Sequence, residues 1–186
     1  MVLLINACAR EESRTLPLAE KAAQKISEDV QRLDLYDQDL RPVDRDTLAR
    51  REAFIADRDF TDDMFRLAHQ FREAENVVIA APFWDLSVPA VLKCYIEFLC
   101  VRELVFSYSD EGVAEGLCNG KRLVYVTTAG GSIPENDHGY GYVRDVFTGF
   151  FGFKETMCIK AEGLDIVGAD ITAILKAAEK EIEERV

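Results

Sequence analysis

Short apolar runs alternate with longer segments of helical periodicity along this chain of 186 residues. The runs are rich in Val, Ile and Leu and lie at Val2–Asn6, Val30–Asp34, Asn76–Ala81, Arg122–Thr127 and Thr156–Lys160. Three of them are nearly continuous rather than alternating in polarity, a pattern typical of strands buried on both faces of a parallel sheet. The pattern therefore predicts five strands, with Val30–Asp34 as the second in chain order.

Between these runs, apolar residues recur three or four positions apart, which predicts amphipathic helices. The predicted helices cover Leu16–Glu28, Thr61–Ala74, Val88–Leu99, Tyr142–Phe151 and Ala169–Glu184. Thr61 is the expected N-cap of the second helix, and Pro89 suits the first turn of the third. In the last helix, the residues expected to face the core are Ile171, Ile174, Leu175 and Ala178.

Strands separated by helices imply βαβ units with right-handed crossovers and helices on both faces of the sheet. The expected fold is a three-layer α/β sandwich that forms one domain over residues 1–186, a length that one core can serve. Two stretches interrupt the alternation. Leu40–Phe60 is polar with a possible helix from Asp46 to Ala56, and Val101–Leu117 contains Val105–Tyr108 as one expected arm of a hairpin.

The charge balance narrows the possible partners. The chain has 22 Lys and Arg against 34 Asp and Glu, a net charge of −12, which repels nucleic acid and anionic membrane surfaces. Nor does any stretch approach the roughly 20 apolar residues that span a bilayer. We therefore predict no nucleic-acid and no membrane partner, and any anion site must be built locally from backbone N–H groups and a few cations.

The cysteines indicate a reducing compartment. Five are scattered along the chain without a C-x-x-C pair or a Cys/His cluster, at Cys8, Cys94, Cys100, Cys118 and Cys158. A zinc site is therefore not expected, and the odd number is typical of buried thiols in the cytosol. The N-terminus is apolar but too short for a secretory signal. The predicted location is cytoplasmic, with no bound metal.

Three loops follow predicted strand ends, where open parallel sheets bind ligands. The first contains Ser13 and Thr15 as hydroxyl donors and Arg10 and Arg14 as cations, at the start of a helix whose dipole favours an anion. The alternative is that Ser13 or Thr15 simply caps the helix, and for this loop alone that is the better interpretation. The loop has neither the G-x-G-x-x-G nor the G-K-[ST] signature.

The second loop, Ala81–Pro89, has two adjacent aromatics and a leucine between two prolines. Such a stiff turn suits a flat aromatic ligand, although it equally suits aromatics that cover the core. The third loop, Thr127–Ser132, has the paired Gly130 and Gly131, whose backbone can approach a ligand closely. Each signal is weak alone, and the hypothesis of one shared site depends on their occurring together after the strands.

The three loops and the segments around them resemble the FMN-dependent NADH:quinone oxidoreductase and azoreductase family, whose members are larger relatives of flavodoxin. The resemblance covers nearly the whole chain. The most specific stretch is A-A-P-F-W-D-L-S-V-P-A-V-L-K at Ala80–Lys93, which is similar to the family's A-A-P-M-Y-N-F segment. Further matches follow in order at Val105–Tyr108, Glu115–Leu117, Thr127–Gly131 and Tyr142–Gly152. The resemblance implies a flavodoxin-like fold whose five parallel strands have the order 2-1-3-4-5.

The resemblance also implies the site residues. Ser13, Arg14 and Thr15 match the segment that binds the FMN phosphate. The segment along the isoalloxazine ring is matched by Pro82, Phe83, Trp84, Asp85 and Leu86, and the loop at its pyrimidine edge by Thr128, Ala129, Gly130 and Gly131. The implied activity is ping-pong hydride transfer from NAD(P)H through the flavin N5 to a quinone, azo or related small-molecule acceptor. No side chain is required as a catalytic residue, since the cofactor carries the chemistry, and backbone N–H groups of Ala129–Gly131 would stabilise charge near flavin N1.

Several positions depart from the family pattern. Cys8 and Ala9 stand where the family has a serine, and Arg10 is the expected compensating group. Asp85 replaces a common asparagine and places a carboxylate near the flavin, which would lower its reduction potential; Ala129 replaces an arginine. The resemblance implies a homodimer in which Tyr142–Phe153 and Val101–Leu117 wall the flavin from across the interface. Two alternatives remain at this stage: a flavodoxin-type electron carrier, and a binding or regulatory protein of this fold without the cofactor.

Overall fold

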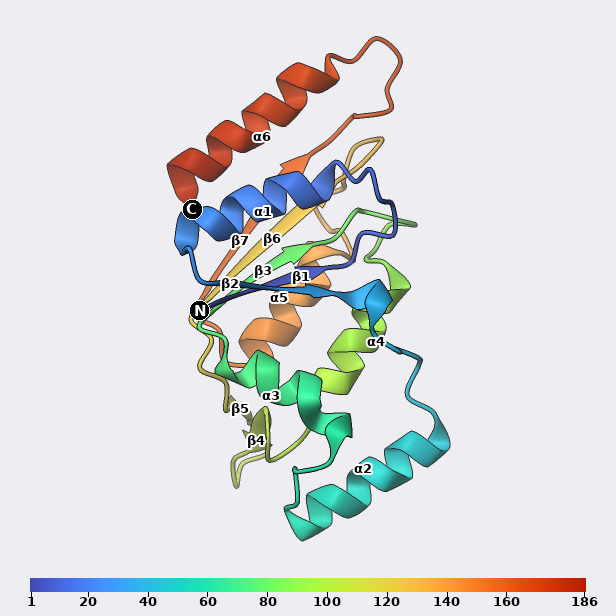
Figure 1. The fold of residues 1–186 in the computed structure, drawn as a ribbon, viewed down its shortest axis with the longest axis vertical. Helices are drawn as coiled ribbons and strands as arrows, with labels where there is room; N and C mark the ends of the chain where they lie inside the picture. Colours follow the sequence, from blue (N-terminus) through green and yellow to red (C-terminus); the bar gives the residue numbers. More distant parts are fainter.

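The computed structural model describes residues 1–186 and has a three-layer α/β architecture (Figure 1). Five parallel strands form the sheet in the order β2-β1-β3-β6-β7. Their bounds are Val2–Asn6 for β1, Val30–Asp34 for β2, Asn76–Ala80 for β3, Arg122–Thr128 for β6 and Glu155–Ala161 for β7. Numbered within the sheet, this is the predicted order 2-1-3-4-5, and no predicted strand boundary is wrong by more than one residue.

The chain has six helices, and they include the possible helix in the polar stretch after β2. Their bounds are Thr15–Ile26 for α1, Arg45–Asp57 for α2, Arg66–Glu73 for α3, Ala90–Leu99 for α4, Tyr140–Gly149 for α5 and Ile171–Arg185 for α6. Two 3₁₀ turns, η1 at Leu35–Asp37 and η2 at Asp63–Phe65, join them. Figure 1 shows α1 and α6 on one face of the sheet, and α3, α4 and α5 on the other. Helix α2 lies at one end of the molecule, away from the sheet.

Strand β1 shows why the strand runs are continuously apolar. Leu3 and Ile5 belong to the core under α3, α4 and α5, whereas Val2 and Leu4 belong to the core under α1 and α6. All four side chains are buried because successive residues of a strand point to opposite faces of the sheet. Each such burial stabilises the fold by roughly 1.5–3 kcal/mol, so a parallel sheet covered on both faces selects apolar residues at every position.

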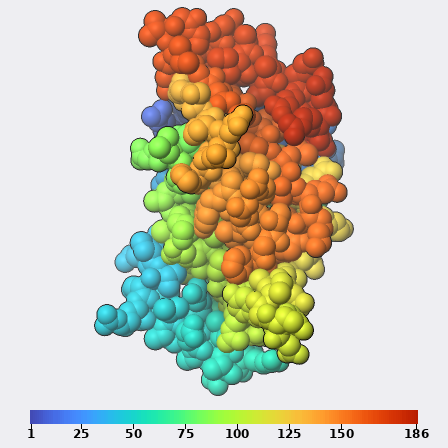
Figure 2. Space-filling model, turned by 180° about the vertical axis from the view of Figure 1, so that it is seen from behind, coloured from blue at the N-terminus to red at the C-terminus, as the bar shows by residue number.

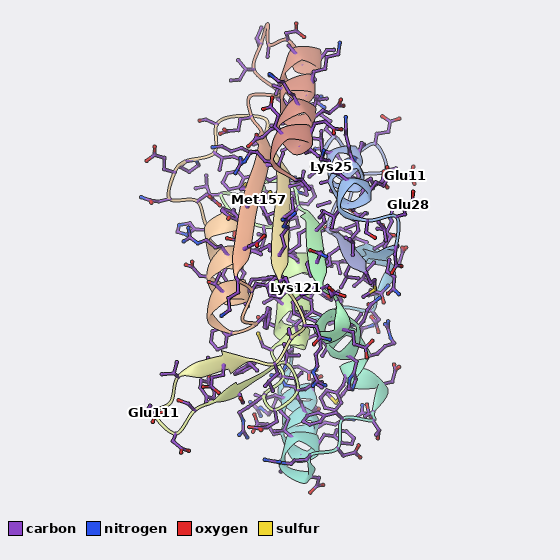
Figure 3. All side chains as sticks on the ribbon, turned by 90° about the vertical axis from the view of Figure 1, so that its left-hand side faces the viewer. Glu11, Lys25, Glu28, Glu111, Lys121 and Met157 are labelled. Carbon is purple, nitrogen blue, oxygen red and sulfur yellow. The ribbon has the colours of Figure 1, made fainter.

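The predicted hairpin is confirmed. It consists of β4 (Phe106–Tyr108) and β5 (Ala114–Gly116), paired antiparallel, and Figure 3 shows it projecting from the body with Glu111 at its tip. At its base, Gly116 contacts the backbone of residues 151 and 152 so closely that a Cβ atom would overlap it. Only glycine fits there, which explains the glycine at this end of β5.

Several local expectations are wrong. Thr61 is not a helix N-cap: its hydroxyl bonds Asp59, and the Asp62 carboxylate accepts the Met64 N–H at the start of η2. Helix α4 begins one residue after Pro89, at Ala90. In α6 only Ile171 differs from the expectation, since it is 37% exposed, whereas Ile174, Leu175 and Ala178 pack against the core.

The thiols are all unpaired, and the molecule is elongated. All five thiols are free, but only Cys8 is fully buried. None of the helices is both long and apolar enough to cross a bilayer. Seen from behind in Figure 2, the segment of α2 lies at one end of an elongated molecule and the C-terminal segment at the other.

Candidate functional site

The three predicted loops, together with a fourth one, surround a single cleft of about 520 Å³ at the carboxyl ends of the strands. Its lining residues are Cys8, Ala9, Arg10, Glu12, Ser13, Arg14, Thr15, Pro82, Phe83, Trp84, Thr128, Ala129, Gly130, Leu164 and Asp165. Ten of the thirteen predicted site residues are among them. Asp85, Leu86 and Gly131 are not; Asp85 and Gly131 directly follow lining residues, and Leu86 follows Asp85.

The first loop is positioned by a buried asparagine at the end of β1. The Asn6 side-chain oxygen accepts a hydrogen bond from the Cys8 N–H at 3.0 Å, which turns the chain away from the strand. Its amide nitrogen donates to Asp34 Oδ1 at 2.6 Å. Hydrogen bonds from the Arg32 guanidinium lower the pKa of Asp34, so this carboxylate stays charged and holds Asn6 in place.

Unpartnered backbone donors are the main feature of this loop. No N–H group of residues 9 to 14 donates a hydrogen bond within the chain. Ser13 Oγ accepts the N–H groups of Thr15 and Leu16 at 3.1 and 3.3 Å, so this serine is the cap of α1. Six free donors in succession, at the positive end of a twelve-residue helix, form a site for an anion.

The two arginines of this loop have different roles. Arg14 Nη1 donates to the Leu164 carbonyl oxygen at 3.2 Å and to Asp165 Oδ1 at 3.0 Å. Its charge is therefore offset by a carboxylate, and it ties the first loop to the segment after β7. Arg10 is exposed and makes no ion pair within the chain. An anion in the cleft would thus meet the backbone donors and Arg10 rather than a free Arg14.

The second loop ends in a strained tight turn. The N–H and carbonyl groups of Trp84 and Ser87 bond each other at 3.1 and 2.8 Å. Between them, Asp85 and Leu86 have φ values of 49° and 64°, in the left-handed region that favours glycine and asparagine. This conformation costs about 1–2 kcal/mol for leucine. Trp84, at one end of this turn, is 36% exposed in the cleft wall.

In the third loop, one of the backbone N–H groups expected to bind the ligand is not available. The Ala129 N–H bonds the Ala161 carbonyl oxygen at 3.0 Å because the β6–β7 pairing continues into the loop, so it is not available to a ligand. The N–H groups of Gly130 and Gly131 donate no hydrogen bond within the chain and are available. Gly130 also lacks room for a Cβ atom, which would overlap the Asp165 carboxylate.

The fourth segment was missed by the sequence analysis. Leu164 and Asp165 line the cleft, and their N–H groups bond the carbonyl oxygens of Ala129 and Gly130 at 3.1 and 3.0 Å. This segment follows β7, so the rule that ligands bind after the carboxyl ends of the strands could have identified it as well. Cys8, Ala9 and Glu12 complete the set of missed residues. Burial raises the pKa of the Cys8 thiol, which therefore stays protonated as a neutral part of the wall.

Thr15 and Thr128 join the first and third loops. Their hydroxyl oxygens are 2.7 Å apart and both residues are buried, so Thr15 contributes to the site by fixing the loops rather than through a free hydroxyl. We expect Thr15→Val to lower the free energy of unfolding by about 1–2 kcal/mol, because it leaves the buried Thr128 hydroxyl without a partner. The double variant Thr15→Val/Thr128→Val should recover part of this loss in a urea-unfolding cycle, and strictly additive losses would contradict the role of the pair.

The cleft fits a phosphorylated aromatic cofactor such as the predicted FMN. The free N–H groups of residues 9–14 and the start of α1 suit a phosphate. Pro82, Phe83 and Trp84 provide a wall that suits a flat ring, and the Gly130 and Gly131 N–H groups suit its polar edge. The donor set is thus complete for both ends of such a molecule.

Comparisons with known proteins agree with this geometry. A model of the family described as having a flavodoxin-like fold matches residues 1–186. The FMN-dependent NADH:quinone oxidoreductase 2 of Clostridium acetobutylicum is 36% identical, covering 99% of this chain and 96% of that protein. The FMN-dependent NADH:quinone oxidoreductase of Clostridium beijerinckii is also 36% identical, with 95% and 93% covered. An azoreductase structure from Bacillus anthracis superimposes with a TM-score of 0.82 at 26% identity, over 98% of this chain and 96% of that one.

Proposed function

We propose the function of this chain from one premise: it belongs to the flavodoxin-like fold family, whose model matches all of its residues. Its function is that of an FMN-dependent NAD(P)H oxidoreductase that reduces quinone, azo or related electrophilic acceptors. The two Clostridium quinone oxidoreductases named above are 36% identical to it over nearly their full length. The observation in the structure that supports this function most is the row of N–H groups at residues 9–14, which have no partner within the chain and belong to a loop that lines the cleft.

In this proposal, each part of the cleft has one task. The N–H groups of residues 9–14 and the Arg10 guanidinium hold the phosphate, while Ser13 keeps those groups in place as the helix cap. Trp84 and its neighbours cover the ring, and the Gly130 and Gly131 N–H groups bind its pyrimidine edge and stabilise negative charge there. The Arg14–Asp165 pair positions the fourth segment as the closing wall.

When bound, FMN supplies the hydride chemistry between donor and acceptor. The chain's residues bind, orient and exclude water; none is assigned a proton-transfer role. Because one cleft serves both substrates, the donor product leaves before the acceptor enters, and the kinetics are ping-pong.

Steady NADH oxidation with a quinone as the sole acceptor tests this function. The FMN-loaded protein is expected to turn over without a partner protein, with parallel double-reciprocal plots for the two substrates. Turnover that requires an added redox protein would instead indicate an electron carrier, and no oxidation at all would contradict the proposed activity.

The active form is a cytoplasmic homodimer in this proposal. The five free cysteines suit a reducing compartment. The resemblance of the sequence to the quinone oxidoreductase and azoreductase family, which implies a homodimer, supports self-association. Sedimentation equilibrium should give twice the chain mass of 21.0 kDa, and a monomer at micromolar concentration would contradict the dimer.

A further inference from the structure

A second hollow adjoins the cleft beyond the tight turn Trp84–Ser87. The cleft is lined by the loop up to Trp84, and a groove of about 580 Å³ begins at Ser87. Its walls come from three segments distant in sequence, represented by Pro42, Val88 and Tyr142. Figure 2 shows these segments side by side on one face of the molecule. The walls are mostly apolar, and such a groove with a few polar groups is the usual form of a small-molecule site.

The polar groups of this groove are mainly hydrogen-bond donors. Lys93 lies in it one helical turn before Glu97, with Nζ to Oε1 at 2.5 Å. This contact raises the pKa of Lys93, which remains a cation, while burial raises the pKa of Tyr142, whose hydroxyl keeps its proton. The His138 side chain adds ring nitrogens, and its backbone is held by a 3.0 Å hydrogen bond from Ser87 Oγ.

These donors are unusual for a chain with a net charge of −12, which otherwise repels anions. The only carboxylate that lines the groove, that of Glu97, already has Lys93 as its partner. Lys93 has two further N–H donors for a ligand. The groove therefore combines an apolar surface for an aromatic ring with a cation, paired with Glu97, at its polar side, across the Trp84–Ser87 turn from the cleft.

We propose that this groove binds the anionic substituent, such as a sulfonate, of an aromatic electron acceptor, and that Lys93 determines the preference for such acceptors. This inference rests on the proposed function, since it names the substrate class of the same site. The nicotinamide donor also carries an anion, its diphosphate, so two different molecules could place a negative charge beside Lys93. We assign the groove to the acceptor, and the experiment separates the two sources.

Two variants that lose the same ion pair provide the test. Lys93→Met removes the cation, and Glu97→Gln releases it from its internal partner. For the 4′-sulfonate of 4-dimethylaminoazobenzene, we expect the dissociation constant from the oxidised FMN-loaded enzyme to rise roughly three- to fivefold in Lys93→Met and to fall by a similar factor in Glu97→Gln. The uncharged parent dye should bind the wild type and both variants equally.

Calorimetric titration without NADH measures these constants, so the result does not depend on turnover. If the dissociation constant shifts in opposite directions in the two variants, and only for the sulfonated dye, the groove binds the anion. This conclusion holds even if the enzyme does not reduce the dye, a result that would contradict the proposed function alone. Equal affinities of the wild type and both variants for the sulfonated dye, or the same shifts for both dyes, would overturn the inference. Neither result would contradict the proposed function. A shift in the KM for NADH without a change in dye affinity overturns the assignment to the acceptor.

Discussion

Replacing Ser13 with aspartate is expected to weaken FMN binding about 100-fold while leaving the fold intact. Ser13 Oγ accepts the N–H groups of Thr15 and Leu16, and aspartate caps a helix as well as serine does. Its carboxylate would lie beside the free N–H groups proposed to hold the phosphate. Two like charges about 5 Å apart near a protein surface repel by roughly 3 kcal/mol, which corresponds to about two orders of magnitude in affinity.

Ser13→Asn is the matched control for this variant, because asparagine caps equally well without a charge. Fluorescence quenching of FMN gives both affinities, and thermal unfolding without FMN checks that the three proteins are equally stable. Riboflavin, which has no phosphate, should bind Ser13→Asp and Ser13→Asn alike. If Ser13→Asp retained wild-type affinity for FMN, the phosphate would not bind at the start of α1.

The largest expected effect on stability comes from Phe71, which is fully buried beneath the sheet. Its ring centroid lies 4.9 Å from that of Phe151, 5.4 Å from that of Phe147 and 5.9 Å from that of Phe153. Phe71→Ala removes one ring from the centre of this group and leaves a cavity that the neighbouring rings cannot fill. We expect the free energy of unfolding to fall by about 3–5 kcal/mol, a large part of the roughly 5–15 kcal/mol typical of a domain.

Urea unfolding measures this loss as a lower midpoint with an unchanged slope. The control is Tyr36→Ala, which truncates an aromatic that is half exposed in η1 and should change the stability by no more than about 0.5 kcal/mol. Similar losses for the two variants would show that the aromatic group around Phe71 is not the centre of the core.

The layers of the fold could be predicted because they depend on local patterns. A parallel strand covered on both faces must be apolar throughout, so Val2–Asn6 was located to the residue. Helix caps were less predictable, since adjacent residues compete: Asp62 accepts a backbone N–H that Thr61 was expected to bind. On α6 the expected residues Ile174, Leu175 and Ala178 do pack against the core, whereas Ile171 at the start of the helix is exposed.

The site was predictable in outline, but its internal pairings were not. Strand ends identified three of its loops, yet the bond between Arg14 and Asp165 joins residues 151 positions apart and depends on the tertiary fold. The Thr15–Thr128 pair is of the same kind. No glycine marks the tight turn after Trp84, because Asp85 and Leu86 adopt left-handed backbone without one. The donors that matter most, the N–H groups of residues 9–14, belong to the backbone and have no residue signature.

An anaerobic absorption spectrum of the purified protein, loaded with FMN and then mixed with NADH, tests the central claim most directly. We expect the protein to retain FMN through gel filtration, its flavin band to bleach on addition of NADH, and the band to return when a quinone is added. A protein that fails to retain FMN, or whose bound flavin is not bleached by NADH or NADPH, would contradict the account.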